Sequence, residues 1–168
     1  MTSKITVRPA LTGDVKAIQG MRQQLEGSKV LLGHELVSLY ESVPEFLVAV
    51  NEVGTVVGAG ALHVMWEDLA EVRSVVVAEN LRGTGIGQAV LEGLLAKAKT
   101  LGIKRVFCLT FETEFFGKQG FEVISDVPVD EATFEQMVRS HDDGVAEFLD
   151  LARVKQNTLG NTRMLKTL

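Results

Sequence analysis

The sequence predicts an α/β (α+β) fold whose mixed central sheet is antiparallel in its N-terminal part and parallel around one crossover. Alternating or continuous β-branched runs with short connections predict an antiparallel meander of three strands, at residues 46–50, 55–64 and 68–77. Apolar residues at helical spacing then predict a helix from Ile86 to a C-cap at Gly102. The strand expected at residues 104–110 follows this helix, so it should lie parallel to the strand before the helix.

Two helices are expected before the meander. A short strand at residues 5–8 meets Pro9, and Thr12 is the expected N-cap of a first helix that ends near Gly27. A second apolar set with a period near four predicts a helix that closes before Pro44.

The C-terminal third is expected to complete the sheet. Residues 115–120 predict a short helix that breaks at a glycine, and residues 121–125 predict a strand. Residues 127–138 predict a helix capped by Asp130, and residues 162–168 predict a final strand. Residues 147–152 fit a strand or a helix equally well.

Length and composition limit the class of protein. The 168 residues fit a single domain over residues 1–168, with 46% hydrophobic and 23% charged residues and no apolar run long enough to span a bilayer. The N-terminus lacks the apolar stretch of a secretory signal, and a single cysteine cannot form an internal disulfide, so we expect a cytoplasmic protein. A net charge of −5 argues against nucleic acid as a partner.

The stretch Arg82-Gly83-Thr84-Gly85-Ile86-Gly87 joins the apolar run Val75-Val76-Val77 to the helix at Ile86. Glycines let the backbone approach a ligand closely, and the first N–H groups of a helix have no partners within it. Such a corner binds anions, and Arg82 adds a planar positive charge suited to phosphate. A purely structural turn is the competing interpretation, but it needs neither three glycines nor an arginine.

Two common nucleotide motifs do not fit this turn. A Walker-type loop needs G-x-x-x-x-G-K-[ST], but Gln88-Ala89 follows Gly87, so the lysine and the metal-binding hydroxyl are missing. A dinucleotide fold needs G-x-G-x-x-G, and the third glycine is replaced by Gln88 or Val90, depending on the starting glycine. The remaining pattern is R-x-x-G-x-G in mid-chain, with Phe115-Phe116-Gly117-Lys118-Gln119-Gly120-Phe121 after the next strand.

This combination resembles the GCN5-related N-acetyltransferases, and the resemblance covers nearly the whole chain. It implies the acyl-CoA N-acyltransferase fold with a parallel β-turn-α-β core that binds acetyl-CoA. Three further segments are similar to the acetyltransferase part of bacterial N-acetylglutamate synthases, especially the short stand-alone form: residues 69–77, 109–113 and 160–165. This implies an enzyme that acetylates the α-amine of L-glutamate or L-glutamine, in the first case as the first step of arginine biosynthesis. The long enzymes also carry an arginine-binding domain, for which this chain has no room, so regulation by arginine is left open.

The resemblance also implies roles for individual residues. Glu71 is the expected general base, and Arg73, two residues along the same strand, would face the same space and hold a substrate carboxylate. A solvated Glu71–Arg73 salt bridge is the competing interpretation. Acetyl-CoA is expected to contact the backbone of the strand, the glycine turn and the position where many relatives carry the acidic tyrosine: Val75, Val76, Val77, Arg82, Gly83, Thr84, Gly85, Ile86, Gly87 and Phe116. Thr110 matches a hydroxyl position of the family and is the alternate proton or hydrogen-bond donor.

Additional cations are expected around the substrate carboxylates, and the candidates are Lys29, Lys155 and Arg163. Cys108 lies in an apolar strand without a neighbouring histidine, so we expect a structural thiol and direct transfer in a ternary complex. His34, His63 and His141 lack metal-ligand spacing, and no metal is expected. A homodimer is a family expectation only. The alternatives are acetylation of another small amine or a peptide N-terminus, and acetyl-CoA sensing without turnover.

Overall fold

The computed structural model describes residues 4–26, 34–151 and 161–168. The strands are hydrogen-bonded in the order β1-β2-β3-β4-β5-β7-β6. Contacts divide the chain into two compact units, residues 1–62 with 72–97 and residues 63–71 with 98–168. Strands β3 (Val56–Trp66) and β4 (Leu69–Val77) each run from one unit into the other. The expected single domain over residues 1–168 stays a prediction.

The first unit contains the antiparallel N-terminal strands, which confirm the predicted pairing of residues 46–50 with the strand expected at 55–64. Strand β1 (Thr6–Pro9) pairs antiparallel with β2 (Phe46–Val50), and β2 pairs antiparallel with β3. The β2–β3 turn is closed by Asn51, whose Oδ1 accepts hydrogen bonds from the N–H groups of Val53 and Thr55. Gly54 provides the left-handed residue of this turn, with a φ of 87°.

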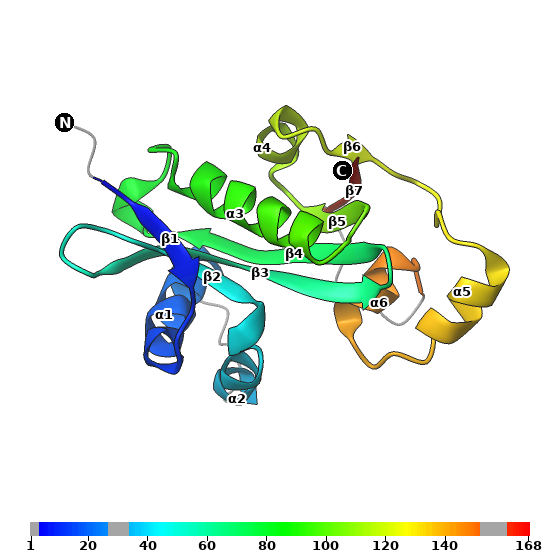
Figure 1. Ribbon diagram of the computed structural model, residues 1–168, viewed down its shortest axis with the longest axis horizontal. Coiled ribbons are helices and arrows are strands. Elements are labelled where there is room, and N and C mark those ends of the chain that lie inside the picture. The colour runs from blue at the N-terminus through cyan, green and yellow to red at the C-terminus, as the bar shows by residue number, and fades with distance from the viewer. Residues whose placement is uncertain (1–3, 27–33, 152–160) are drawn as a thin grey trace. The chain divides into compact units, whose positions relative to one another are not determined.

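Helices α1 (Val15–Glu26) and α2 (His34–Glu41) lie side by side in this unit (Figure 1). Apolar side chains at helical spacing on α1 pack against β2, β3 and β4, where the partners include Val48, Ala59 and Val76. After α2, Pro44 lies in a short 3₁₀ turn (Val43–Glu45), so the second helix closes where the proline predicts.

Thr12 is not the N-cap of the first helix, so that prediction is wrong. Residues Thr12–Asp14 form a 3₁₀ turn before α1, and the capping acceptor is Asp14, whose Oδ2 accepts the N–H of Leu11 at 2.8 Å. The same carboxylate accepts hydrogen bonds from Nη1 and Nη2 of Arg8 at 2.8 and 3.2 Å, which ties β1 to the start of the helix. This fork suits Asp14 better than a threonine hydroxyl because it pairs two donors with two oxygens.

Helix α3 (Ile86–Thr100) packs on the face of β3 that carries Gly58 and Gly60. Ala59 and Ala61 alternate with these glycines and belong to the core formed with α1 and α2. The C-terminal part of α3 is tied to the start of β2 by Lys97, whose Nζ donates to the Pro44 carbonyl at 2.8 Å. Beyond α3, Gly102 has a φ of 88°, which confirms the predicted glycine C-cap.

The second unit contains the predicted parallel crossover partner. Strand β5 (Arg105–Thr110) pairs parallel with β4 and antiparallel with β7 (Thr162–Thr167), so both strand predictions are confirmed. Helix α4 (Thr113–Lys118) is followed by β6 (Glu122–Val123), which pairs with β7 and is shorter than expected. At the start of the strand, the Phe121 N–H bonds to the Phe116 carbonyl, so residue 121 belongs to the helix terminus.

Two short helices complete this unit, and each begins at an aspartate. Helix α5 (Glu131–Met137) is capped by Asp130 as predicted, and α6 (Asp143–Phe148) is capped by Asp142. Hydrogen bonding from Thr133 lowers the pKa of Asp130. The stretch at 147–152, which fitted two interpretations, is helical up to Phe148, because that aromatic side chain is needed in the core against Phe107 at a ring separation of 5.2 Å. Across the three described ranges, no helix is both long and apolar enough to cross a membrane.

The Arg8–Asp14 contact should make the stability of the first unit depend on pH. Hydrogen bonds from Arg8 are the main reason that the pKa of Asp14 is lowered. A lowered carboxyl pKa gives stability that is present above the unfolded value of about 3.9 and is lost as the pH falls through the folded value. We expect Asp14→Asn to reduce the free energy of unfolding by about 1–3 kcal/mol at pH 7.

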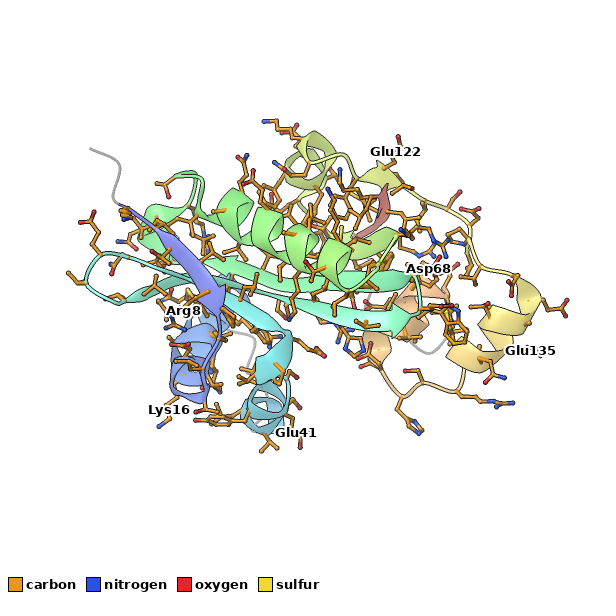
Figure 2. The ribbon with its side chains drawn as sticks, viewed as in Figure 1. Arg8, Lys16, Glu41, Asp68, Glu122 and Glu135 are labelled. Atoms are coloured by element: carbon orange, nitrogen blue, oxygen red, sulfur yellow. The ribbon has the colours of Figure 1, made fainter. Side chains whose placement is uncertain are left out.

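Urea unfolding at pH 7 and at pH 3 measures this difference. The matched control is Glu135→Gln, on an exposed position of α5 (Figure 2), which should change the midpoint little at either pH. An Asp14→Asn midpoint equal to that of the unmodified chain at pH 7 would contradict the role of the pair.

Candidate functional site

The glycine turn lies in the first unit between β4 and α3, after a 3₁₀ turn at Glu79–Leu81. Gly83 and Gly85 have φ values of 77° and 91°, a backbone region that side chains disfavour. No heavy atom would lie within 4 Å of a Cβ at either position, so these glycines are required by backbone conformation and not by crowding. Thr84 stabilises the turn by donating its hydroxyl hydrogen to the Leu81 carbonyl.

The turn presents positive charge to solvent. Arg82 is exposed, and no acidic residue lies in the first turn of α3, which is 15 residues long. The Ala89 N–H donates to the Gly85 carbonyl and begins the helical ladder, and the N–H groups before it point out of the helix end. The positive end of the helix dipole, the outward N–H groups of the first turn and the guanidinium of Arg82 together suit a phosphate or pyrophosphate.

Strand β4 is interrupted just before the three valines expected to bind the cofactor. Ser74 has a φ of 58°, a left-handed backbone conformation that is unusual for residues other than glycine, asparagine and aspartate. The alternation that would place Glu71 and Arg73 on one face therefore does not continue regularly past residue 74, because it needs an extended backbone there. Beyond the break, Val75 faces the glycine side of β3 and Val76 faces the core formed with α1. Such interruptions free backbone groups from regular strand pairing.

Glu71 lies in the second unit and is a buried carboxylate, with 4% of its surface exposed. Its register partner on β5 is Phe107, so Glu71 shares a sheet face with that ring. Burial raises the pKa of the Cys108 thiol, and the charge of Glu71 raises it further. The thiol is thus held protonated, which supports its predicted structural role.

Thr110 is also buried, but on the other face of β5. Alternation from Phe107 places Cys108 and Thr110 on the face opposite Glu71. The Thr110 Oγ1 accepts the N–H of Glu112 at 2.8 Å, so the hydroxyl hydrogen is directed elsewhere. This geometry leaves Thr110 able to donate one hydrogen bond.

Phe116 is a packed aromatic residue in the same unit. Its ring forms edge-to-face contacts with Phe115 and Phe121 at centroid separations of 5.1 and 5.2 Å, and 6% of its surface is exposed. These contacts explain the F-F-x-x-x-G-F pattern as core packing. Its contact with the cofactor stays a prediction.

Arg163 uses its donors within the protein. Its Nε donates to the Glu147 carbonyl and its Nη2 donates to the carbonyls of Asp126 and Phe148. The guanidinium carbon lies 6.0 Å from the centre of the Phe107 ring, and burial lowers the pKa of Arg163. These contacts favour a structural role, which joins β7 to the end of α6, over the predicted substrate contact.

The other predicted cations are less defined. Arg73 is half-buried on β4, next to Ser74, whereas Lys29 and Lys155 lie outside the described residues. His63 Nε2 lies 3.8 Å from Asp142 Oδ1, which gives it a partner in the second unit. Among the residues that the structure describes, no group of three His, Cys, Asp or Glu side chains could hold a metal ion.

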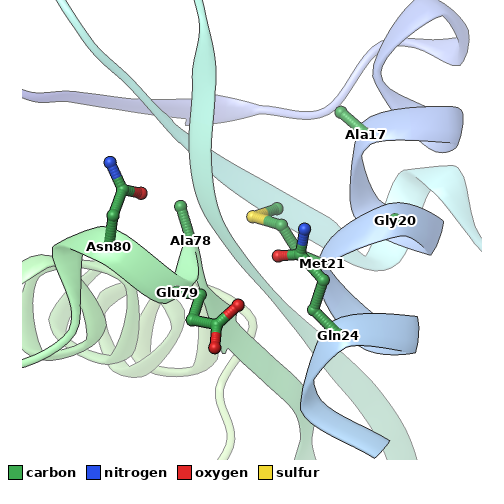
Figure 3. A pocket seen from close by; sticks show the side chains of 7 residues that line it. All are labelled: Ala17, Gly20, Met21, Gln24, Ala78, Glu79 and Asn80. Atoms are coloured by element: carbon green, nitrogen blue, oxygen red, sulfur yellow. The ribbon is translucent and has the colours of Figure 1, made fainter. Parts of the chain in front are cut away.

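A pocket of 490 Å³ in the first unit is not anticipated by any motif in the sequence (Figure 3). It lies between α1 and the segment 78–80, which leads from β4 toward the glycine turn. Ala17, Met21 and Ala78 supply its apolar wall. Gln24, Glu79 and Asn80 supply amides and one carboxylate, which suit an ammonium or amide group and disfavour a phosphate.

The sequence-based prediction also missed the backbone features around the turn. Gly58-Ala59-Gly60 in mid-strand was a usable signal, since glycine inside a strand often marks a close approach. The left-handed Ser74 gave no signal, because serine is common in ordinary strands and turns alike.

Comparison with known proteins places the chain among acetyltransferases. The model of the Acetyltransferase (GNAT) family matches residues 22–121. An amino-acid acetyltransferase of Mycobacterium tuberculosis is 52% identical over 96% of this chain and 94% of that protein. A crystal structure from M. tuberculosis in complex with CoA and NLQ superposes with a TM-score of 0.90 at 52% identity, and the match covers 97% of this chain and 99% of that one.

A more distant structure shares the fold. N-acetylglutamate synthase from Neisseria gonorrhoeae, complexed with coenzyme A and N-acetyl-glutamate, has a TM-score of 0.76 at 22% identity, over 100% of this chain and 36% of that one. The glycine turn after β4, the parallel β4–α3–β5 unit and the family match over more than half of the sequence lead to one conclusion: the chain belongs to the GNAT acetyltransferase family.

Proposed function

We propose that the chain transfers the acetyl group of acetyl-CoA to the α-amine of L-glutamate or L-glutamine. With glutamate the product is N-acetylglutamate, and the reaction is the first step of arginine biosynthesis. The family membership and the 52% identity to an amino-acid acetyltransferase support this assignment. The observation that carries the chemistry is Glu71, a buried carboxylate on the strand that leads to the glycine turn.

Acetyl-CoA supplies the acetyl group, and the glycine turn is proposed to hold its pyrophosphate. The exposed Arg82 and the N-terminus of α3 offer the charge-assisted and backbone donors that phosphate oxygens need. Residues 75–77 are proposed to align the pantetheine arm through backbone hydrogen bonds, as an added strand would. The left-handed Ser74 marks a local irregularity of the strand next to these residues, and a backbone N–H near Val75 is proposed to donate to the oxyanion.

Glu71 is proposed to accept a proton from the substrate ammonium, directly or through a water molecule, because an ammonium cannot attack a carbonyl. The amine nitrogen then forms a bond to the thioester carbon, and the carbonyl π electrons move to the oxygen. Collapse of this oxyanion expels the CoA thiolate, and the nitrogen that becomes the amide loses its remaining extra proton to solvent. Thr110 can donate a hydrogen bond to the departing sulfur, while solvent supplies the proton that makes free CoA thiol.

Transfer without an acetyl-enzyme fits the state of Cys108. Only the thiolate is a good nucleophile, and burial together with the Glu71 charge raises the pKa of this thiol. Cys108 is also 1% exposed. Both facts support direct attack of the amine on acetyl-CoA in a ternary complex.

The choice between glutamate and glutamine depends on the cations near the acceptor side chain. Arg73 is proposed to bind the α-carboxylate, which both amino acids carry. A second carboxylate needs a second donor, and Arg163 already donates to three carbonyl groups. This leaves Lys29 and Lys155 as the proposed partners for the glutamate side chain, and glutamine needs neither.

Acetyl-CoA sensing without turnover is the second candidate, and Phe116 is the observation that favours it. A phenylalanine at the position of the usual acidic tyrosine cannot protonate the leaving sulfur. Release of free CoA that depends on an amino acid would exclude this alternative.

A panel of amino acids and amines, screened for CoA release, tests the acceptor. We expect glutamate and glutamine to give values of kcat/KM at least about 100-fold above alanine or leucine, because a site built for polar groups rejects analogues that lack them. Equal rates with a peptide N-terminus would contradict the proposed acceptor class and favour the broader amine acetyltransferase.

Removal of the base should separate catalysis from binding. We expect Glu71→Gln to lower kcat by about 100- to 10,000-fold, because general base catalysis typically contributes that much. The dissociation constant for acetyl-CoA, measured by calorimetry, should stay within about twofold. The matched control is Glu122→Gln on the exposed strand β6, which removes one negative charge from the same unit (Figure 2). Full activity of Glu71→Gln across the pH range would show that another group accepts the proton.

The pyrophosphate role of Arg82 can be isolated by shortening the ligand. We expect Arg82→Ala to weaken CoA binding by about tenfold, consistent with one solvent-exposed charge-assisted contact. Binding of acetyl-pantetheine, which has no pyrophosphate, should be unchanged. An equal loss for both ligands would mean that Arg82 acts on the fold of the turn and not on phosphate.

A further inference from the structure

Gly58 on β3 lies directly against the first residue of α3. A Cβ atom at Gly58 would be 2.6 Å from Cγ2 of Ile86, 3.4 Å from the Val76 carbonyl oxygen and 3.5 Å from Cβ of Ala49. Carbon atoms in contact normally lie about 3.5–4.0 Å apart, so a side chain at position 58 would require Ile86 or the backbone to move. The missing side chain at position 58 therefore defines how closely α3 approaches the sheet at its N-terminus.

Ile86 has little freedom to avoid such a clash. It is β-branched, it begins α3 and 5% of its surface is exposed. A β-branched residue in a helix strongly prefers one χ1 rotamer, so its Cγ2 methyl moves mainly when the backbone moves. Relief of the contact would take a displacement of about 0.9 Å to reach the short end of normal carbon contacts.

That backbone is also the anion-binding turn. Ile86 lies between Gly85 and Gly87, and because the helical ladder begins with the Ala89 N–H, the N–H groups of residues 86–88 have no partner within the helix. Hydrogen bonds weaken steeply with distance and angle, and a binding constellation needs its groups within about 0.5 Å of the productive positions. A shift of Ile86 would therefore move the donors out of register with a pyrophosphate.

We propose that Gly58 is a positioning residue for acetyl-CoA: the absence of a side chain there lets Ile86 pack against β3 and holds the N–H groups of the turn in place. The inference rests on the proposed binding of the pyrophosphate at this turn. Gly58 itself touches no ligand in this assignment, and it acts through Ile86.

Gly60 supplies the comparison that separates positioning from ordinary packing. A Cβ there would lie 2.9 Å from both Leu94 Cδ1 and Val90 Cγ1. Val90 and Leu94 lie four and eight positions after Ile86 on α3, or about 6 and 12 Å from it along the helix axis. Gly60→Ala should therefore lower the melting temperature of the protein, while the geometry of the turn is disturbed less.

Calorimetric titration with CoA and with acetyl-pantetheine tests the proposal. We expect Gly58→Ala to weaken CoA binding by about ten- to a hundredfold, and acetyl-pantetheine binding by less than about threefold, because misplacement by about 1 Å has effects of that order. In steady-state kinetics KM for acetyl-CoA should rise, with KM for the amino acid nearly constant. Gly60→Ala should change CoA affinity by less than about threefold, although it should lower the melting temperature at least as much as Gly58→Ala does. Gly13→Ala, where no heavy atom lies within 4 Å of the added Cβ, should change neither property.

Substitution of Ile86 distinguishes the proposed contact from other causes. Ile86→Ala removes Cγ2 and should restore CoA affinity in the Gly58→Ala background to the level of Ile86→Ala alone. Ile86→Val retains that methyl group and should not restore it. If the single variant Gly58→Ala does not fold, the combinations of Gly58→Ala with Ile86→Ala and with Ile86→Val provide the same test. The combination with Ile86→Ala should bind CoA at least about tenfold more tightly than the combination with Ile86→Val.

The outcomes separate the inference from the proposed function. Failure of the unmodified protein to bind CoA would overturn the proposed function and the positioning role with it. If the unmodified protein binds CoA and Gly58→Ala binds it with equal affinity, the positioning role alone is overturned. Equal losses in Gly58→Ala and Gly60→Ala, or equal affinities of the two double variants, would reduce Gly58 to a packing residue and also overturn the inference.

Discussion

The close approach of α3 to β3 is the constraint on which the cofactor side of the first unit depends. Strand β3 carries small residues on both faces, with glycines toward α3 and alanines toward the core under α1. Helices α1 and α3 can therefore both pack closely against β3, each on its own face of the strand. The α3 side uses this proximity to fix a helix terminus, whereas the α1 side uses it to bury apolar surface.

In the second unit the organising element is β5, because the parallel pairing with β4 and the antiparallel pairing with β7 both run through it. Its register decides that Glu71 and Thr110 occupy opposite faces of the sheet. In the proposed reaction the amine nitrogen and the leaving sulfur are bonded to the same carbon in the tetrahedral intermediate, and each needs its own proton-handling group. Side chains on opposite faces of a sheet point away from each other, so the register favours Glu71 as the base for the amine and solvent as the proton source for the sulfur.

Much of this fold could be predicted from periodicity and glycine positions. The parallel β4–α3–β5 unit followed from a strand, a glycine turn and an amphipathic helix in sequence, and the Asp130 cap from its place before an apolar run. Thr12 was misassigned because its hydroxyl competes with Asp14, whose two oxygens serve both Arg8 and Leu11. The start of β6 could not be predicted, because it depends on the hydrogen bond from the Phe121 N–H to the Phe116 carbonyl of α4.

The candidate site was predictable where chemistry depends on residue type and less so where it depends on backbone. Arg82 and the glycines were found from their spacing, and Glu71 from the resemblance to a family. Arg163 could not be assigned from sequence, since its carbonyl partners come from segments 15 and 37 residues away. The conformation of Ser74 could not be predicted either, because serine has no preference for a left-handed backbone.

The protected thiol of Cys108 has a consequence for an enzyme that releases a thiol at every turnover. Oxidation converts CoA to its disulfide, and a mixed disulfide with the protein forms when an accessible protein thiolate attacks it and expels one CoA thiolate. Cys108 is the one cysteine in the chain, and its sulfur is both buried and held protonated. Released CoA can therefore accumulate under mildly oxidising conditions without forming a mixed disulfide with Cys108.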